Sequence, residues 1–218
     1  MKLAIKLIKN KLATGLLSIA FLYIVLLLTG VLKSFVNLEI ISNIDEIIGS
    51  IVNSFQTIMG LKIFSLITFL GEIYLVIVFA IILSVILWMK NKKWQISVLW
   101  LTLIGSEVFT YVTKLIVNRP RPEYAVFLEH SGSFPSNHAT VAMAFYGFLI
   151  YLLLQYLKNK RERFLIATLG IIIILTIGFS RLYLGVHYFS DVLTGYLVGL
   201  LWLCIGINLT KKIITKQK

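Results

Sequence analysis

Cysteine and charged side chains are scarce in this sequence. The single cysteine, Cys204, excludes an internal disulfide framework, and its place in an apolar run indicates a small packing residue. Charged residues make up only 14% of the 218 residues, and only nine residues are acidic. Internal repeats, low-complexity segments and a polar second domain are absent as well. The sequence therefore predicts one domain over residues 1–218.

What the chain has in excess is apolar residues. They make up 59% of the sequence, and the mean hydropathy is +0.93, whereas about half of the residues in a soluble domain are apolar. The net charge of +12 would suit nucleic-acid binding if it formed a basic face on a soluble module, but here the cations cluster between apolar runs. These features predict an integral membrane protein with no nucleic-acid partner.

Six apolar runs are long enough to cross a bilayer as helices, which takes about 20 residues each. They predict an all-α, polytopic membrane protein. The first run follows a basic segment, as in a signal peptide, but it continues to Leu32 and exceeds the roughly 7–15 apolar residues of a signal peptide. We therefore expect it to be retained. The six predicted spans lie near 12–32, 63–89, 94–116, 137–157, 164–180 and 189–209.

The lysine and arginine residues predict the orientation of these spans. With a cytoplasmic N-terminus, 15 of the 21 cations fall on the inner side, which satisfies the positive-inside rule and makes both termini cytoplasmic. Some of the remaining cations lie near the outer ends of the third and fifth spans, where topology does not account for them. These are Lys114, Arg119, Arg121 and Arg181.

Residues 39–59, between the first two spans, have apolar side chains at a spacing of three to four, which is typical of an amphipathic helix. The opposite face carries Asp45, Glu46, Asn53 and Gln56, so this helix is too polar to span. We expect it to lie on the outer membrane surface. There it either borders a route for a lipid to reach the site or simply covers the bundle.

Three polar stretches lie near the predicted outer surface, and the first, KLIVNRPRP, begins at Lys114. Pro120 and Pro122 keep Arg119 and Arg121 out of helical geometry. Lys114 at a helix end and Arg121 in an extended segment can therefore converge. Taken alone, the cluster also fits a solvated face or a face for lipid headgroups.

The second stretch, PSNH, begins at Pro135 and introduces the fourth predicted span. Ser136 is a preferred N-cap residue, and the backbone N–H groups of Asn137 and His138 have no partners within the helix. A helix N-terminus of this kind is suited to bind an anion. Taken alone, the motif also fits an ordinary cap with a neighbouring histidine.

The third stretch, SRLYLGVHYFSD, ends at Asp191. His187 and Asp191 are four residues apart, so we expect them to share one face of a helix. The carboxylate would then accept a hydrogen bond from one ring nitrogen and leave the other free as a nucleophile. Arg181 adds a fork-shaped donor suited to phosphate oxygens. Taken alone, the pair also fits a purely structural role.

Together, the three stretches resemble the signature of the type 2 phosphatidic acid phosphatases, a family of lipid phosphate phosphatases related to bacterial acid phosphatases and vanadium haloperoxidases. The signature is a lysine, six residues and Arg-Pro; then Pro-Ser-Gly-His; then Ser-Arg, five residues, His, three residues and Asp. Ten specified positions match in order. Asn137 replaces the glycine, and we expect phosphate binding to survive because asparagine tolerates unusual backbone angles and keeps its N–H.

The resemblance implies a lipid phosphatase that forms a phosphohistidine intermediate. It implies that His187 attacks phosphorus, that Asp191 orients His187, and that His138 protonates the leaving group and later activates water. Arg119 and His130 match no signature position, so we interpret them as headgroup contacts or bystanders. The residues implied to hold the phosphate oxygens are Lys114, Arg121, Ser136, Asn137 and Arg181.

Two alternatives remain open at this point. Two histidines and a carboxylate can also form a metal triad, but the surrounding cations would repel a divalent ion, so we expect neither a metal nor another cofactor. A lipid-phosphate binding or transport protein would use the same cationic site without hydrolysis. Glu107, an acidic residue inside the third span, is the feature that favours this second alternative.

The cations on the outer side predict a lipid phosphate that arrives from the outer leaflet. The candidates are phosphatidic acid, phosphatidylglycerophosphate and undecaprenyl pyrophosphate, and the motifs do not choose among them because they contact only the phosphate. The small size, short loops and richness in lysine, isoleucine and asparagine indicate a bacterial protein. The oligomeric state stays open: Gly195, Gly199 and Gly206 in the last span would allow either close helix contact within the bundle or dimerisation.

Overall fold

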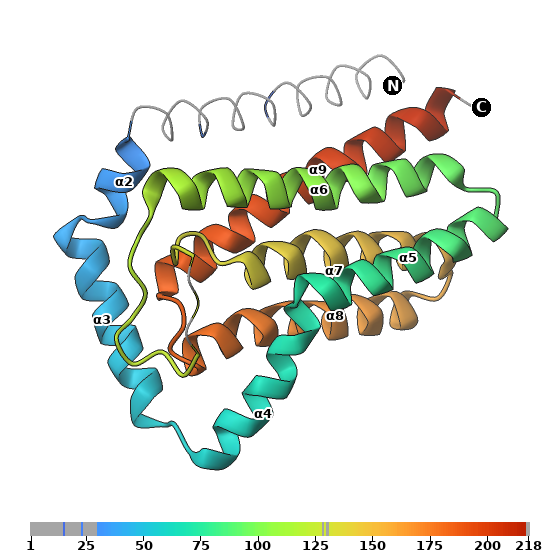
Figure 1. The fold of residues 1–218 in the computed structure, drawn as a ribbon. Coiled ribbons are helices and arrows are strands. Elements are labelled where there is room, and N and C mark those ends of the chain that lie inside the picture. The colour runs from blue at the N-terminus through green and yellow to red at the C-terminus, as the bar shows by residue number, and fades with distance from the viewer. Residues whose placement is uncertain (1–14, 16–22, 24–29, 128, 130, 217–218) are drawn as a thin grey trace.

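A computed structural model describes residues 15, 23, 30–127, 129 and 131–216, and every regular element within them is a helix. The longest helices are α6 to α9, and Figure 1 shows α3 lying across one end of them. All three prolines of the chain lie in the loop between α6 and α7, so none interrupts a helix. The helices are α2 (Val31–Val36), α3 (Glu39–Ser54), α4 (Ile58–Thr68), η1 (Phe69–Gly71), α5 (Ile73–Met89), α6 (Lys93–Val117), α7 (Asn137–Tyr156), α8 (Lys160–Tyr183) and α9 (Phe189–Lys216).

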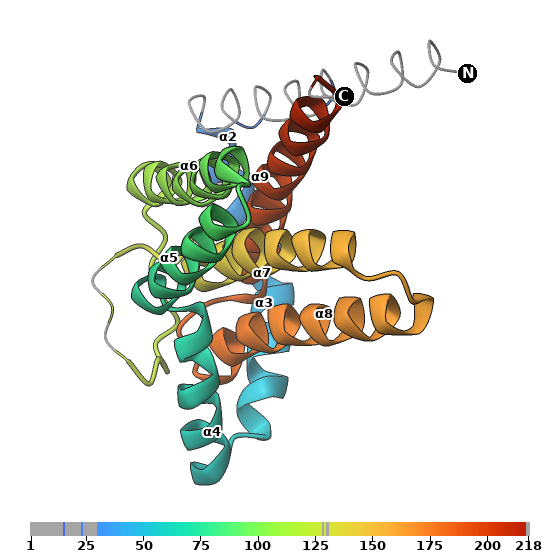
Figure 2. The same cartoon turned by 90° about the vertical axis from the view of Figure 1, so that its right-hand side faces the viewer.

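The central helix is α7, which packs against α6, α8 and α9 (Figure 2). Two glycines let α9 approach it closely. A Cβ atom at Gly195 would lie 2.5 Å from the carbonyl oxygen of Ser136, and one at Gly199 would lie 2.5 Å from that of Thr140. The prediction that these glycines allow close helix contact within the bundle is therefore confirmed.

Helices α6, α7, α8 and α9 are long and apolar enough to cross a membrane. They match the last four predicted spans, although α8 begins at Lys160 and is longer than the predicted 164–180. The protein is accordingly a multi-pass membrane protein. Most of the predicted first span, 12–32, lies outside the described residues, so its retention and the total of six spans stay predictions.

The predicted second span, 63–89, is wrong as a continuous helix. The chain breaks after Thr68, passes through η1 and resumes as α5, which has only 17 residues. Tyr146 of α7 donates a hydrogen bond to the Leu70 carbonyl (2.7 Å), which satisfies a backbone group that the break leaves open. The break also places Glu72 at the N-terminus of α5, beside His138.

The predicted amphipathic helix is present as α3, and its position at a membrane surface stays a prediction. α3 and the α4–η1 segment meet at a bend of 118°. Side chains such as Ile40, Ile44, Ile47 and Ile51 are exposed along α3. Asp45, however, does not face outward with Glu46 and Asn53 but is buried against the bundle.

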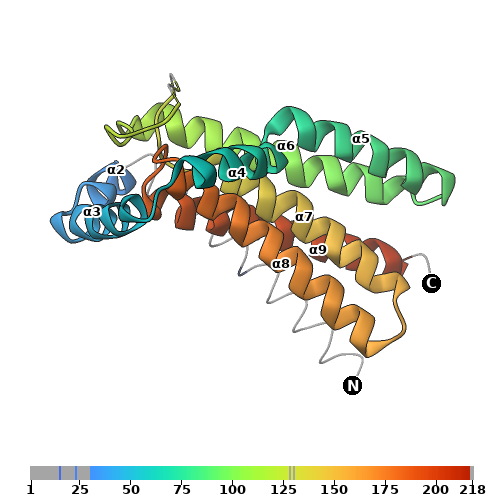
Figure 3. The same cartoon turned by 90° about the horizontal axis from the view of Figure 1, so that it is seen from below.

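The two ends of the bundle differ in charge and content. The α5–α6 turn, the α7–α8 connection and the last turns of α9 lie at one end, and the loops after α6 and α8 lie with α3 at the other (Figures 1 and 3). The first end carries many of the lysine and arginine residues that the topology places in the cytoplasm. The second end carries all three polar stretches that the sequence singled out.

Candidate active site

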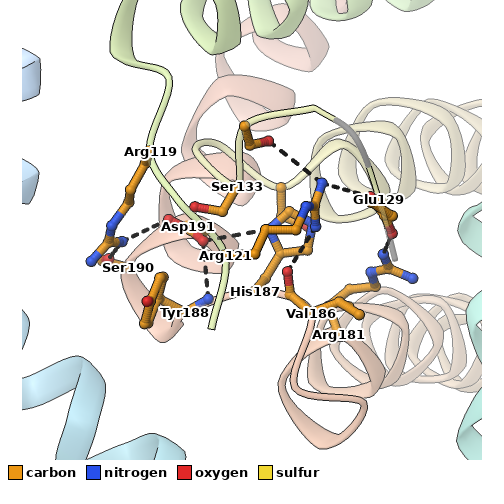
Figure 4. Close-up of polar contacts among 12 residues, drawn as sticks. Arg119, Arg121, Glu129, Ser133, Arg181, Val186, His187, Tyr188, Ser190 and Asp191 are labelled. Carbon is orange, nitrogen blue, oxygen red and sulfur yellow. Dashed lines mark hydrogen bonds and ion pairs between the residues drawn. The ribbon is translucent and has the colours of Figure 1, made fainter. Parts of the chain in front are cut away.

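The three polar stretches converge at the end of the bundle that faces α3, and Figure 4 shows residues of the first and third stretches there. Lys114 lies in the last turn of α6, where its ammonium group is buried and donates to the Gly132 carbonyl (2.6 Å). Arg121 also reaches that carbonyl, at 3.5 Å, from the loop after α6. The predicted meeting of Lys114 and Arg121 is therefore confirmed.

His187 and Asp191 are neighbours, but they do not share a helix as the spacing predicted. His187 lies in the loop before α9, and Asp191 lies in the first turn of α9. Gly185, with φ of +64°, allows this loop to turn. The Tyr188 N–H donates to Asp191 Oδ2 (3.0 Å), which fixes the carboxylate with that oxygen 3.4 Å from His187 Nδ1.

The other ring nitrogen of His187 faces a cation. His187 Nε2 lies 3.3 Å from Nη1 of Arg121, and His187 Nδ1 has no hydrogen-bond partner among the described residues. Burial, followed by the charges of Arg181, Lys114 and Arg121, holds the pKa of His187 well below its ordinary value. The ring is therefore neutral at neutral pH and has a nitrogen available as a nucleophile.

Arg121 and Arg181 converge on one carboxylate. Glu129 accepts from Arg121 Nη2 at Oε2 (2.6 Å) and from Arg181 Nη2 at Oε1. Burial opposes the ionisation of Glu129, but the two guanidinium groups outweigh it and lower the pKa of this carboxyl. Two guanidinium groups that share one carboxylate are also close enough to share one phosphate group.

His138 lies in the first turn of α7 and joins the site through Arg181, whose Nη1 is 3.5 Å from His138 Nε2. The same ring nitrogen lies 3.1 Å from Glu72 Oε2. Sequence reasoning missed Glu72 because it placed this residue inside a span. The hydrogen bond with His138 is the main reason that the pKa of Glu72 lies below its ordinary value. A second imidazole–carboxylate pair thus borders the cations.

Ser136 occupies the N-cap position of α7 without capping it. Its side chain makes no cap hydrogen bond, and its buried Oγ has no partner among the described residues. The Ser136 N–H donates to the Asp191 carbonyl (3.0 Å), which holds the start of α7 beside the start of α9. Asn137, the residue that departs from the family signature, begins α7, and its side chain lies near Glu107 of α6.

Arg119, interpreted from the sequence as a headgroup contact or bystander, is neither. It is buried and pairs with Asp191 Oδ1 (2.7 Å) and with Asp45 Oδ2 (2.8 Å). The additional Arg-Pro unit at Arg119, just before the signature unit at Arg121, was a visible signal, but the spacing did not reveal a partner 72 residues away. His130, the other unassigned residue, lies outside the described residues.

The comparisons with known proteins decide the family. The sequence model of the PAP2 superfamily matches residues 73–214, a range that contains every predicted site residue. The chain belongs to the PAP2 superfamily. It is a membrane phosphatase of this superfamily, and the predicted family membership is confirmed.

Relatives within the superfamily act on lipid phosphates. The chain is 36% identical over 141 residues to phosphatidylglycerophosphatase B of Bacillus subtilis. This match covers 62% of this chain and 68% of the relative. It is 29% identical over 145 residues to undecaprenyl-diphosphatase BcrC of the same organism, and this match covers 63% of this chain and 69% of that relative. A crystal structure of a transmembrane PAP2 type phosphatidylglycerolphosphate phosphatase from Bacillus subtilis superimposes with a TM-score of 0.79 at 25% identity, covering 92% of this chain and 96% of that one.

Proposed function

We propose that this protein is a metal-independent lipid phosphatase that removes phosphate from a lipid phosphomonoester or pyrophosphate through a phosphohistidine. The observation that carries the proposal is the convergence of Arg121 and Arg181 on one carboxylate, with His187 Nε2 beside Arg121. This arrangement offers an anion two forked donors and a neutral nucleophile at the same point.

Substrate binding replaces the carboxylate of Glu129 with phosphate. Arg121 and Arg181 donate hydrogen bonds to the phosphate oxygens, and the ammonium group of Lys114 lies next to the Arg121 guanidinium group. The N-terminus of α7 adds the Asn137 N–H and the unpartnered hydroxyl of Ser136. These groups stabilise the charge that develops on the equatorial oxygens.

In the first chemical step, His187 Nε2 forms a bond to phosphorus as the bond to the lipid oxygen breaks. Asp191 stabilises the positive ring through Nδ1, and His138 gives its proton to the departing oxygen. In the second step, His138 removes a proton from water, the hydroxide attacks phosphorus, and the N–P bond breaks to release inorganic phosphate. Glu72, hydrogen-bonded to His138, stabilises that ring in its protonated form.

The site faces the extracytoplasmic side in this proposal. The support is the charge difference between the two ends, because the positive-inside rule puts the lysine-rich turns in the cytoplasm. The exposed isoleucines of α3 suit a helix that lies in the membrane surface next to the site. A lipid of the outer leaflet then reaches the cations without leaving the bilayer.

The physiological substrate belongs to the class that the relatives' names describe. Phosphatidylglycerophosphate and undecaprenyl pyrophosphate are the first two candidates, because both relatives match over similar lengths, and phosphatidic acid is the third. Phosphate release from the three lipids in detergent, measured side by side in EDTA, distinguishes them. The proposal expects activity in EDTA and inhibition by vanadate, whereas loss in EDTA with rescue by a divalent ion would refute metal independence.

A binding or transport protein is the competing function. His187→Ala separates the two, because removal of the nucleophile abolishes phosphate release and leaves the guanidinium groups in place to bind the lipid. Undiminished phosphate release by His187→Ala would exclude the nucleophile, and no release from wild type would favour binding alone.

A further inference from the structure

Asp45 is a buried carboxylate on a helix whose other acidic groups are exposed. It is 2% exposed, whereas Glu39 and Glu46 of α3 face outward. A buried carboxylate is costly unless it is paired and hydrogen-bonded. Asp45 is both: Oδ1 accepts from the Ser190 N–H (2.8 Å), and Oδ2 accepts from Ser190 Oγ (2.6 Å) and from Arg119 Nη2 (2.8 Å).

Arg119 joins Asp45 to the catalytic carboxylate. Its Nη1 donates to Asp191 Oδ1 (2.7 Å) and to Ser190 Oγ (2.8 Å) (Figure 4). Its guanidinium group lies over the ring of Tyr188, 4.0 Å from the ring centre. The plane of the guanidinium group is therefore fixed by two carboxylates, a hydroxyl and an aromatic face.

The way in which Arg119 contacts Asp191 leaves half of that carboxylate for His187. Only Nη1 of Arg119 reaches Asp191, and it donates to Oδ1. Oδ2 remains to accept from the Tyr188 N–H and to face His187 Nδ1. Arginine and a carboxylate favour a two-bond pairing, and Asp45 prevents it here because it occupies Nη2.

We propose that Asp45 is a positioning residue of the phosphatase reaction: from α3 it holds Arg119 so that Asp191 keeps one oxygen for His187. Without Asp45, the guanidinium group closes on both oxygens of Asp191 and draws the carboxylate away from the imidazole. Through Asp45, the helix α3 then helps to position the site as well as covering the bundle. This inference rests on the proposed role of His187 as nucleophile.

Steady-state kinetics of Asp45→Asn test the inference. We expect kcat to fall by about 10- to 100-fold, by analogy with the loss of outer-shell partners that orient metal-binding histidines. KM and the inhibition constant of vanadate stay unchanged, because Lys114, Arg121 and Arg181 are untouched. Asp45→Glu restores the carboxylate and recovers part of kcat. The matched control is Glu46→Gln, which alters an exposed carboxylate on the same helix and leaves kcat unchanged.

A milder variant keeps the test decisive if Asp45→Asn does not fold, as thermal unfolding in detergent reveals. Ser190→Ala removes one contact to Asp45 and one to Arg119 and retains every charge, so it should lower kcat in the same direction by a smaller factor. Unchanged kcat in these variants, or a fall in kcat with an equal weakening of vanadate binding, would overturn the inference. Failure of wild type to release phosphate would instead refute the proposed function.

Discussion

At the residue scale, the chemistry of the site is a balance between cations and carboxylates. Lys114, Arg121 and Arg181 were predicted from the family signature, and the structure brings them together. Glu129 was not predicted, because a glutamate in an irregular loop gives no periodic signal. Its carboxylate pairs with Arg121 and Arg181, so in the proposed mechanism substrate and Glu129 compete for the same donors.

Glu129→Gln should therefore bind vanadate more tightly than wild type does. Removing the charge frees both guanidinium groups to bind the inhibitor. A charge-assisted hydrogen bond contributes about 1.5–3 kcal/mol, and this contribution is smaller here because Glu129 is a third exposed. We therefore expect vanadate to inhibit roughly threefold to tenfold more tightly. The vanadate concentration that inhibits phosphate release measures this affinity. Glu123→Gln, an exposed glutamate of the same loop, is the control, and weaker inhibition of Glu129→Gln would contradict this account.

The pKa of His187 predicts the acid limb of the pH–rate profile. Because burial and nearby cations hold this pKa well below 6.5, the ring stays neutral and nucleophilic until the pH falls far below that value. The profile of kcat/KM should therefore lose activity only well below pH 6.5. The same shift makes the free energy of unfolding decrease as the pH falls below 6.5, because the unfolded chain then binds a proton that the folded site refuses. An acid limb at or above pH 6.5 would contradict the proposal that a His187 with a lowered pKa is the nucleophile.

At the element scale, the sequence predicted helices well and their interruptions poorly. Residues 63–89 are mostly apolar and contain no charged residue apart from Glu72, so hydropathy predicted one span. The break depends on partners that hydropathy cannot reveal: Tyr146 for the Leu70 carbonyl and His138 for the Glu72 carboxylate. Likewise, the pattern found α3 but could not show that Asp45 points into the bundle.

The contact between α7 and α9 determines whether the site assembles, because α7 carries His138 and α9 carries Asp191. Gly199→Val would place side-chain atoms against the Thr140 carbonyl and Met143 and force the two helices apart. We expect a loss of about 1–3 kcal/mol in stability, typical of overpacking, and a lower kcat. Thermal unfolding in detergent measures the first effect. The neighbouring Leu200→Ala, at an exposed position, is the control, and an equal change in both variants would contradict the close contact.

At the scale of the whole molecule, the charge pattern and the fold agree. The sequence placed the lysine-rich turns on one side and the polar stretches on the other, and the structure puts them at opposite ends of the bundle. The ten signature positions were enough to predict the family, because their residue types and spacing match the family signature in order. The partners that orient them, Asp45, Glu72 and Arg119, lie outside the matched signature positions, and only the folded chain reveals their roles.

The central claim is that His187 becomes phosphorylated. The most direct test is to mix the enzyme with a lipid phosphate that carries a radioactive phosphate group, to quench the reaction rapidly, and to measure the label bound to the protein. The account predicts an acid-labile, base-stable label on His187 in wild type and none in His187→Ala. An active wild-type enzyme with no protein-bound label, or with the label on a different residue, would contradict it.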